Sequence, residues 1–140
     1  MGSLSEYRRT AGSVHSLGFH LVWCPKYRRS VLVGAVANRL RDLIAAKCAE
    51  RKWTVEALEI MPDHVHLFVR SGPKASPAHV AHQIKGSTSH ALRREFPRLR
   101  SRLPTLWSKS YFVASVGRVS EATIRRYIAE QSTAPTPGVP

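Results

Sequence analysis

The order in which strand and helix patterns follow one another limits this chain to few folds. Two β-type segments, 53–60 and 64–70, are separated only by the turn sequence Met61-Pro62-Asp63, so we expect them to pair as antiparallel neighbours. One strand pattern and one helical pattern precede this pair, and one of each follows it. These four segments are 17–24 (strand), 35–51 (helix), 78–96 (helix) and 111–116 (strand).

Strand, helix, strand, strand, helix, strand is the order of a split βαβ, ferredoxin-like domain. We therefore predict an α+β fold, in which an antiparallel sheet carries its helices on one face. A further helix is predicted at about 121–131, with Ser120 as its N-cap. Residues 132–140 are rich in proline and are expected to be disordered.

The net charge indicates which class of partner the protein binds. The 140 residues include 22 Lys and Arg but only 9 Asp and Glu, which gives a formal net charge of +13. Such an excess on a small domain favours a polyanionic partner, above all nucleic acid. No apolar run approaches the length of a membrane span, and the two cysteines have no metal-type spacing, so we expect a cytoplasmic protein with reduced thiols.

Two histidines in the sequence "MPDHVHLFV" give the first indication of chemistry. Side chains alternate along a strand, so His64 and His66 share one face while Val65 points into the core. The two imidazoles then lie roughly 7 Å apart at the backbone and can converge on one ion. Two histidines alone are also common on sheet faces, so this pattern needs further ligands. Asp63 is interpreted as a turn residue and not as a ligand.

The last predicted helix contains a second pair of interest. Tyr127 and Gln131 are four residues apart in "IRRYIAEQ", so they lie one turn apart on the same helix face. An ordinary amphipathic helix has the same spacing. Together with two histidines and a basic domain, however, the pair suits phosphodiester cleavage in which a tyrosine attacks phosphorus and a divalent ion stabilises the departing oxygen.

Five ordered blocks resemble a known family. They are "HLVWCPKYRRSVL", "MPDHVHLFV", "IKGSTSHAL", "LWSKSYFVASVG" and "IRRYIAEQ". In this order and spacing they look like the single-tyrosine HUH (histidine, hydrophobic residue, histidine) transposases of the insertion-sequence 200/605 family. The resemblance covers residues 15–131 as one domain and leaves 1–14 as an N-terminal tail.

The resemblance implies specific roles. His64, His66 and Gln131 would be ligands of Mg²⁺ or Mn²⁺, and Tyr127 would be the nucleophile that becomes linked to the 5′ phosphate of cut single-stranded DNA. The substrate would carry imperfect hairpins at the ends of a mobile element. The family also implies a homodimer in which the tyrosine helix of one subunit completes the site of the other in trans, although the sequence itself leaves a cis arrangement open.

Contacts with the DNA backbone are expected from basic residues of the matching blocks and of the arginine-rich segment "LRREFPRLRSRL", residues 92–103. These residues are Lys26, Arg28, Arg29, Lys85, Arg93, Arg94 and Lys109. Four aromatic residues could stack on unpaired bases, with core packing as the default for the tryptophans; they are Trp23, Tyr27, Trp107 and Tyr111.

The sequence leaves two alternatives open. One is a domesticated HUH nuclease that acts on palindromic repeats of the host chromosome. The other is a ferredoxin-like module that binds single-stranded nucleic acid without catalysis, in which the histidines and Tyr127 only pack or stack.

Overall fold

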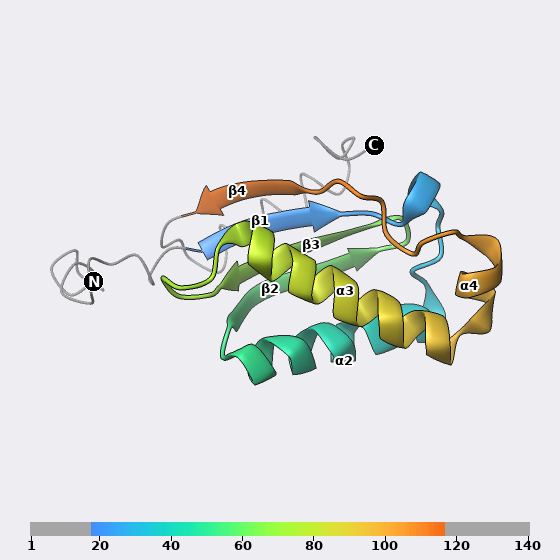
Figure 1. Cartoon of the computed structure of the whole chain (residues 1–140), viewed down its shortest axis with the longest axis horizontal. Coiled ribbons are helices and arrows are strands. Elements are labelled where there is room, and N and C mark those ends of the chain that lie inside the picture. The colour runs from blue at the N-terminus through green and yellow to red at the C-terminus, as the bar shows by residue number, and fades with distance from the viewer. Residues whose placement is uncertain (1–17, 117–140) are drawn as a thin grey trace, which may run out of the picture.

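A four-stranded antiparallel sheet with helices on one side forms the framework of the protein (Figure 1). The computed structural model describes residues 18–116. Its elements are β1 (Gly18–Trp23), η2 (Lys26–Arg28), α2 (Gly34–Arg51), β2 (Thr54–Met61), β3 (His64–Arg70), α3 (Pro77–Glu95), α4 (Pro97–Arg102) and β4 (Phe112–Val116). The predicted strands and helices within this range are all present, with boundaries that differ by one residue at most ends.

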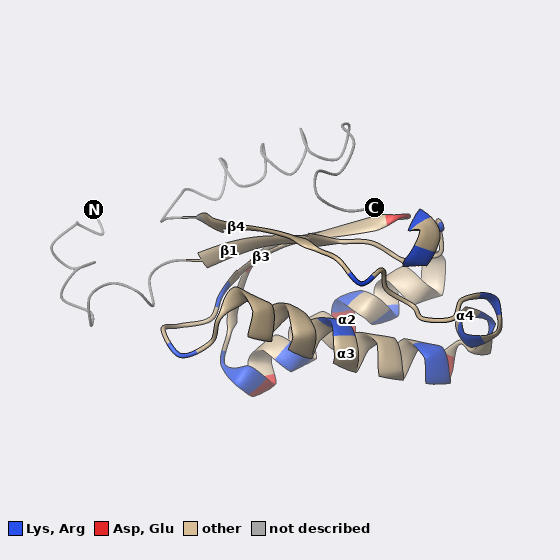
Figure 2. Cartoon of the chain, turned by 45° about the horizontal axis from the view of Figure 1, so that its top comes forward, with Lys and Arg blue, Asp and Glu red and all other residues tan. Residues whose placement is uncertain are grey.

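The strand order is β2-β3-β1-β4, and every neighbouring pair is antiparallel. Two βαβ units therefore interleave, because β3 lies between β1 and β2, and β1 lies between β3 and β4. Figure 2 shows α2 and α3 on the same side of this sheet. The predicted ferredoxin-like α+β architecture is confirmed. The predicted helix at 121–131 and both tails lie outside the described residues.

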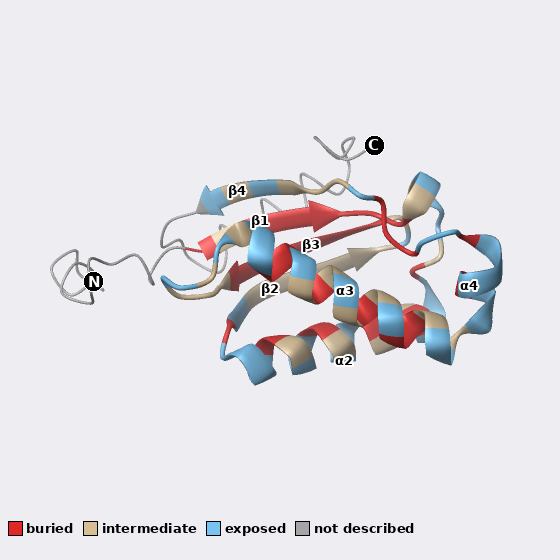
Figure 3. Cartoon of the chain, viewed as in Figure 1, coloured by how far each residue is buried: buried red, intermediate tan, exposed pale blue. Residues whose placement is uncertain are grey.

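The core lies between the sheet and the two long helices. Leu21, Val65 and Leu67 are each 0% exposed and face Leu40 of α2 and Ile84 of α3 in one apolar cluster. Figure 3 shows β1 and β3 buried over most of their length, since both are flanked by other strands. The two central strands are therefore the most buried part of the sheet.

Proline determines where the arginine-rich segment breaks. The α-helix α3 begins after Ser76, whose side chain accepts a hydrogen bond from the backbone N–H of His79 at 3.1 Å, and Pro77 occupies its first turn. It ends at Glu95, because Phe96 precedes Pro97 and is held at φ −126° and ψ 86°, outside the helical region. The short helix α4 then starts at Pro97. The sequence predicted a helix that ends at residue 96 but not α4, which has only 6 residues and is too short to show a helical period.

The turn before β2 differs slightly from the prediction. Trp53 was expected to begin the strand, but its backbone N–H instead donates to the carbonyl of Cys48 at 2.8 Å. Lys52 closes α2 in the left-handed conformation at φ 62°.

Within residues 18–116, no helix has the length and apolar character needed to cross a membrane.

Candidate active site

Alternation along β3 divides its side chains between two environments. Val65, Leu67 and Val69 belong to the apolar cluster beneath α2 and α3. His64 and His66 therefore lie on the opposite side of the sheet, which we call the histidine face. His66 pairs in register with Val22, and Phe68 pairs with His20, so His20 also belongs to this face.

The ring of His66 is held by His20. His66 Nδ1 and His20 Nε2 lie 3.0 Å apart and form a buried hydrogen bond between residues 46 positions apart in the chain. The His20 ring also stacks on Phe68, with centroids 4.3 Å apart and planes inclined by 5°. Because a hydrogen bond and a stacked ring restrain the two imidazoles, the orientation of His66 is determined by residues on both central strands.

The ring of His64 is held by a second chain of polar contacts. Its Nδ1–H donates to Asp63 Oδ1 at 2.8 Å, and Arg28 Nη2 donates to Asp63 Oδ2 at 3.1 Å. Burial raises the pKa of Asp63, but the hydrogen bond with His64 and the charge of Arg28 outweigh it, so the pKa lies below its usual value. Asp63 is thus a carboxylate that orients His64, in addition to its place in the predicted turn.

These contacts leave one nitrogen of each histidine free for a ligand. The Nε2 atoms of His64 and His66 are buried and have no hydrogen-bond partner among the described residues. The two rings are close, with centroids 4.9 Å apart and planes inclined by 82°. A buried imidazole nitrogen without a partner is costly, whereas a metal-binding histidine commonly uses one nitrogen for the ion and the other for an orienting hydrogen bond. The two histidines therefore fit the predicted metal.

Protonation favours the same role for His66. Burial, together with the nearby charges of His20 and His64, lowers the pKa of His66 to about 3, and burial lowers the pKa of His20 to about 4. Both rings are neutral near pH 7, and a metal ion binds only neutral imidazole.

The described residues include two candidate ligands and not a complete set. Between residues 18 and 116, no group of three or more His, Cys, Asp and Glu side chains is arranged to hold a metal ion. The predicted third ligand, Gln131, and the predicted nucleophile, Tyr127, both lie outside the described residues.

Six of the seven basic residues expected to contact DNA fall into two groups, and the seventh, Lys26, lies beside the ring of Tyr27. Arg28, Lys85 and Arg93 have partners within the protein: Lys85 Nζ donates to the carbonyl of Ser108 at 2.8 Å and to two further carbonyls, and Arg93 donates to the carbonyl of Leu103 at 3.1 Å. Burial also lowers the pKa of Lys85. By contrast, an exposed group makes no side-chain hydrogen bond or ion pair with the rest of 18–116. This group consists of Arg29, Arg94 and Lys109.

The aromatic residues divide in the same way. Trp23 and Trp107 are buried and pack edge to face with centroids 5.9 Å apart, so the default expectation of core packing is confirmed. Tyr27 is 65% exposed, with Lys26 Nζ 5.5 Å from its ring centroid. Tyr27 remains accessible to a base.

Sequence reasoning missed His20. It stands in the alternating segment "GFHLVW", where a polar residue among apolar ones was the available signal. Nothing local indicated that it meets His66, because that contact requires the register in which β1 pairs with β3.

Comparison with known proteins identifies the family. A family model described as "Transposase IS200 like" matches residues 13–131. The ISDra2 transposase TnpA of Deinococcus radiodurans is 35% identical over 128 residues, which cover 90% of this chain and 91% of that protein. The transposase for insertion sequence element IS200 of Salmonella typhimurium is 28% identical over 133 residues, 87% of each chain.

Solved structures show the same fold. A crystal structure described as a transposase from Deinococcus radiodurans superposes with a TM-score of 0.67 at 34% identity, covering 81% of this chain and 89% of that one. A REP-associated tyrosine transposase bound to a REP hairpin superposes with a TM-score of 0.60 at 17% identity, covering 85% of this chain and 69% of the other. The histidine face thus lies in a ferredoxin-like domain that matches transposases along most of its length, and the chain belongs to the IS200-like transposase family.

Proposed function

We propose that this transposase cuts and rejoins single-stranded DNA at hairpin-marked ends of a mobile element, through a covalent 5′-phosphotyrosine at Tyr127. The observation that carries the proposal is the pair of buried Nε2 atoms on His64 and His66, each without a partner in the described chain. A protein that only bound DNA would gain nothing from two buried, unsatisfied nitrogens, which cost stability unless a ligand uses them.

The proposed ligands are His64, His66 and Gln131, with Mg²⁺ or Mn²⁺ as the ion. A divalent cation bound there would neutralise charge on the scissile phosphate and on the departing oxygen. His20 and Asp63 hold the two imidazoles through their Nδ1 atoms, so that each Nε2 lone pair points away from its orienting partner.

The covalent step conserves the energy of the phosphodiester. The phenolic oxygen of Tyr127 forms a bond to phosphorus and loses its proton, while the bond from phosphorus to the 3′ oxygen breaks and that oxygen leaves as a hydroxyl after taking up a proton. Attack of a 3′ hydroxyl on the phosphotyrosine reverses these changes and rejoins a strand, so no nucleotide cofactor is consumed.

The proposed substrate is single-stranded DNA with an imperfect hairpin. The high positive charge supports a polyanionic partner, and one structural relative is bound to a REP hairpin. We further propose a homodimer whose tyrosine helices are shared in trans. The relatives at 35% and 28% identity are transposases of insertion sequences, which favours a mobile-element enzyme over a domesticated nuclease.

Adduct formation tests the nucleophile. The protein is incubated with Mg²⁺ and a single-stranded oligonucleotide carrying a hairpin from the DNA that flanks its gene. We expect a covalent adduct that survives a denaturing gel, because a phosphotyrosine ester is stable to denaturation. Tyr127→Phe should abolish the adduct, whereas Tyr27→Phe, which removes the hydroxyl of an exposed tyrosine, should retain it. An undiminished adduct in Tyr127→Phe would refute the assignment.

The same assay distinguishes trans from cis. Tyr127→Phe and His64→Ala subunits are each expected to be inactive. After subunit exchange, a mixture regains one working site per heterodimer only if one subunit supplies the tyrosine and the other supplies the histidines. A mixture that stays inactive although heterodimers are present excludes the trans arrangement.

A further inference from the structure

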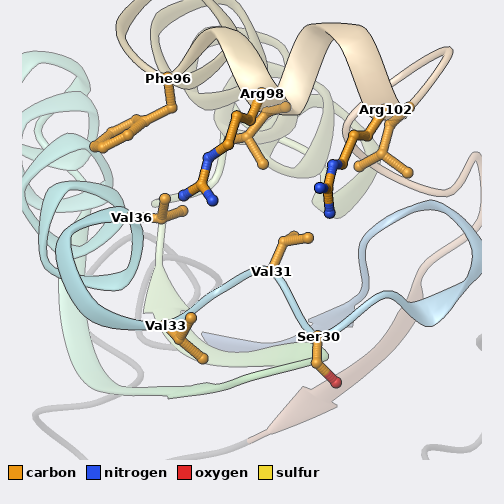
Figure 4. A pocket seen from close by; sticks show the side chains of 9 residues that line it. Ser30, Val31, Val33, Val36, Phe96, Arg98 and Arg102 are labelled. Atoms are coloured by element: carbon orange, nitrogen blue, oxygen red, sulfur yellow. The ribbon is translucent and has the colours of Figure 1, made fainter.

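A hollow with arginines on one side lies away from the histidine face. Its volume is about 190 Å³, and it is enclosed by α4, the first turn of α2 and the loop between η2 and α2. Figure 4 shows Arg98 and Arg102 extending from α4 across this hollow toward Val36 and Val31. We call it the arginine hollow.

The walls of the arginine hollow are apolar. Val33, the N-cap of α2, is 52% exposed, so it contributes apolar surface that solvent can reach. Val31, Val36 and Phe96 line the same space and are partly or fully covered by the core behind them. Such a surface suits a flat apolar group that enters from solvent.

The two arginines are not neutralised by any residue that the structure describes. Arg98 and Arg102 are exposed, and neither side chain forms a hydrogen bond or ion pair with another residue of the described range. By contrast, the charge of Arg39 on α2 is neutralised, because its guanidinium makes two hydrogen bonds to Glu95, at 2.7 and 3.0 Å. Arg29, which also has no side-chain partner between residues 18 and 116, adds a third guanidinium in an adjoining depression that shares Val31 and Arg102. The local field therefore attracts an anion.

The loop that forms one wall also supports the candidate active site. The backbone N–H of Leu32 donates to the carbonyl of Pro62 at 3.0 Å, and Pro62 is two residues before His64. Arg28, at the start of this loop, donates to Asp63, which in turn orients His64. A DNA strand that leaves the histidines along this loop would reach the arginine hollow.

We propose that the arginine hollow binds one unpaired nucleotide of the single-stranded DNA next to the cleavage site. Its base packs on Val33, Val36 and Phe96, and its phosphates contact Arg98 and Arg102. The proposal rests on the proposed function for its substrate class. A base in a duplex has both faces covered by its neighbours, so only an unpaired base can use the apolar wall. With Ser30 as the one uncharged polar residue lining the hollow, little base preference is expected.

Binding to three DNAs tests the proposal without cleavage. The probes are a fluorescent 15-residue oligothymidylate, an abasic deoxyribose-phosphate chain of the same length, and a blunt hairpin without single-stranded flanks, all in EDTA. The variants are Arg98→Gln/Arg102→Gln and Val33→Asn. Asparagine is a favourable N-cap and Val33 is the N-cap of α2, so the second variant should not weaken the fold. The matched control, Arg41→Gln/Lys74→Gln, removes two exposed charges elsewhere.

Removing the two arginine charges should weaken the binding of both single strands and reduce its dependence on salt. Each phosphate contact contributes about 0.7 to the slope of log K against log salt for single strands, so the double variant should lower the slope by roughly 1.4. Val33→Asn should weaken the binding of the oligothymidylate by about threefold, which is less than the loss of an aromatic stacking platform would cause. Binding of the abasic chain should be unchanged. The blunt hairpin and the control should show neither effect.

Three results would overturn the proposal. The variants could lose as much affinity for the blunt hairpin as for the single strands, the control variant could lose as much affinity as they do, or their binding of both single strands could be unchanged. These outcomes are independent of the adduct assay. If the wild type forms an adduct but the variants bind normally, the hollow is not a DNA site and the proposed function stands. If the variants lose single-strand binding and no adduct forms, the hollow is supported and the nuclease assignment fails.

Discussion

The two faces of the central strands are equally buried but differ in the state of their polar atoms. Val65 and His66 are neighbours on β3, and each is 0% exposed. The side chain of Val65 has no polar atom and packs in an apolar cluster, whereas the side chain of His66 keeps one buried nitrogen without a partner in the described chain. Burial alone therefore does not separate structure from function in this sheet; two close imidazoles on one face, each with an unsatisfied Nε2, do.

Alanine substitutions at these neighbouring positions should have opposite consequences, and this is the largest effect we expect. His66→Ala removes a proposed metal ligand, so adduct formation should fall by at least about 100-fold while binding of the hairpin changes little. Val65→Ala should lower the free energy of unfolding by about 2 kcal/mol, because it leaves a cavity, with cleavage by the folded fraction retained. Urea unfolding and the adduct assay measure both. Cleavage that survives in His66→Ala, or in EDTA, would remove the basis of the comparison.

His20 offers a sharper test, because two substitutions separate its hydrogen bond from its packing. His20→Phe keeps a ring that can stack on Phe68 but lacks an acceptor for His66 Nδ1–H, whereas His20→Gln keeps an acceptor. We expect Mn²⁺ affinity, measured by titration calorimetry, to fall by about 10-fold or more in the Phe variant and to recover partly in the Gln variant. If both variants bind Mn²⁺ equally, His20 has only a packing role.

The pH dependence of stability should originate mainly from the histidine face. His20 and His66 have pKa values lowered to about 4 and about 3, against the ordinary 6.5, so the unfolded chain binds more protons than the folded one between these values. In EDTA, the stability should therefore be complete above about pH 6.5 and fall as the pH is lowered toward 4, by on the order of a few kcal/mol. Thermal unfolding from pH 7.5 to 4 measures the decline. His20→Phe should make it shallower, and an equally steep curve in that variant would assign it to other groups.

The smallest expected effects separate two lysines that were both predicted to contact DNA. Lys85 donates to three carbonyls before β4, so Lys85→Met should lower the unfolding free energy by about 1–2 kcal/mol and leave the salt dependence of DNA binding nearly unchanged. Lys109 is exposed, so Lys109→Gln should leave stability unchanged and reduce the salt slope by about 0.7 for a single strand. The reverse pattern would assign Lys85 to the DNA and contradict its structural role.

Much of this protein could be predicted from local patterns. The alternation in "HVHLFV" predicted that two histidines share a face and that Val65 is buried, because the period of a strand depends only on neighbouring residues. Pro97 predicted the end of α3 for an equally local reason, since the residue before a proline avoids the helical region. The order of strands and helices left the ferredoxin-like sheet as the simplest arrangement. Tyr127 and Gln131 stay predictions, because they lie outside the described residues.

Contacts between distant segments were decided only by the tertiary structure. His20 meets His66 across 46 positions because β1 and β3 pair in one register, and a shift of one residue would turn His20 to the other face. Arg28 reaches Asp63, and Arg98 faces Val36, because a loop and a short helix dock on the same end of the sheet. Sequence spacing determines which way a side chain points along its own element, whereas strand register and helix packing determine what it meets there.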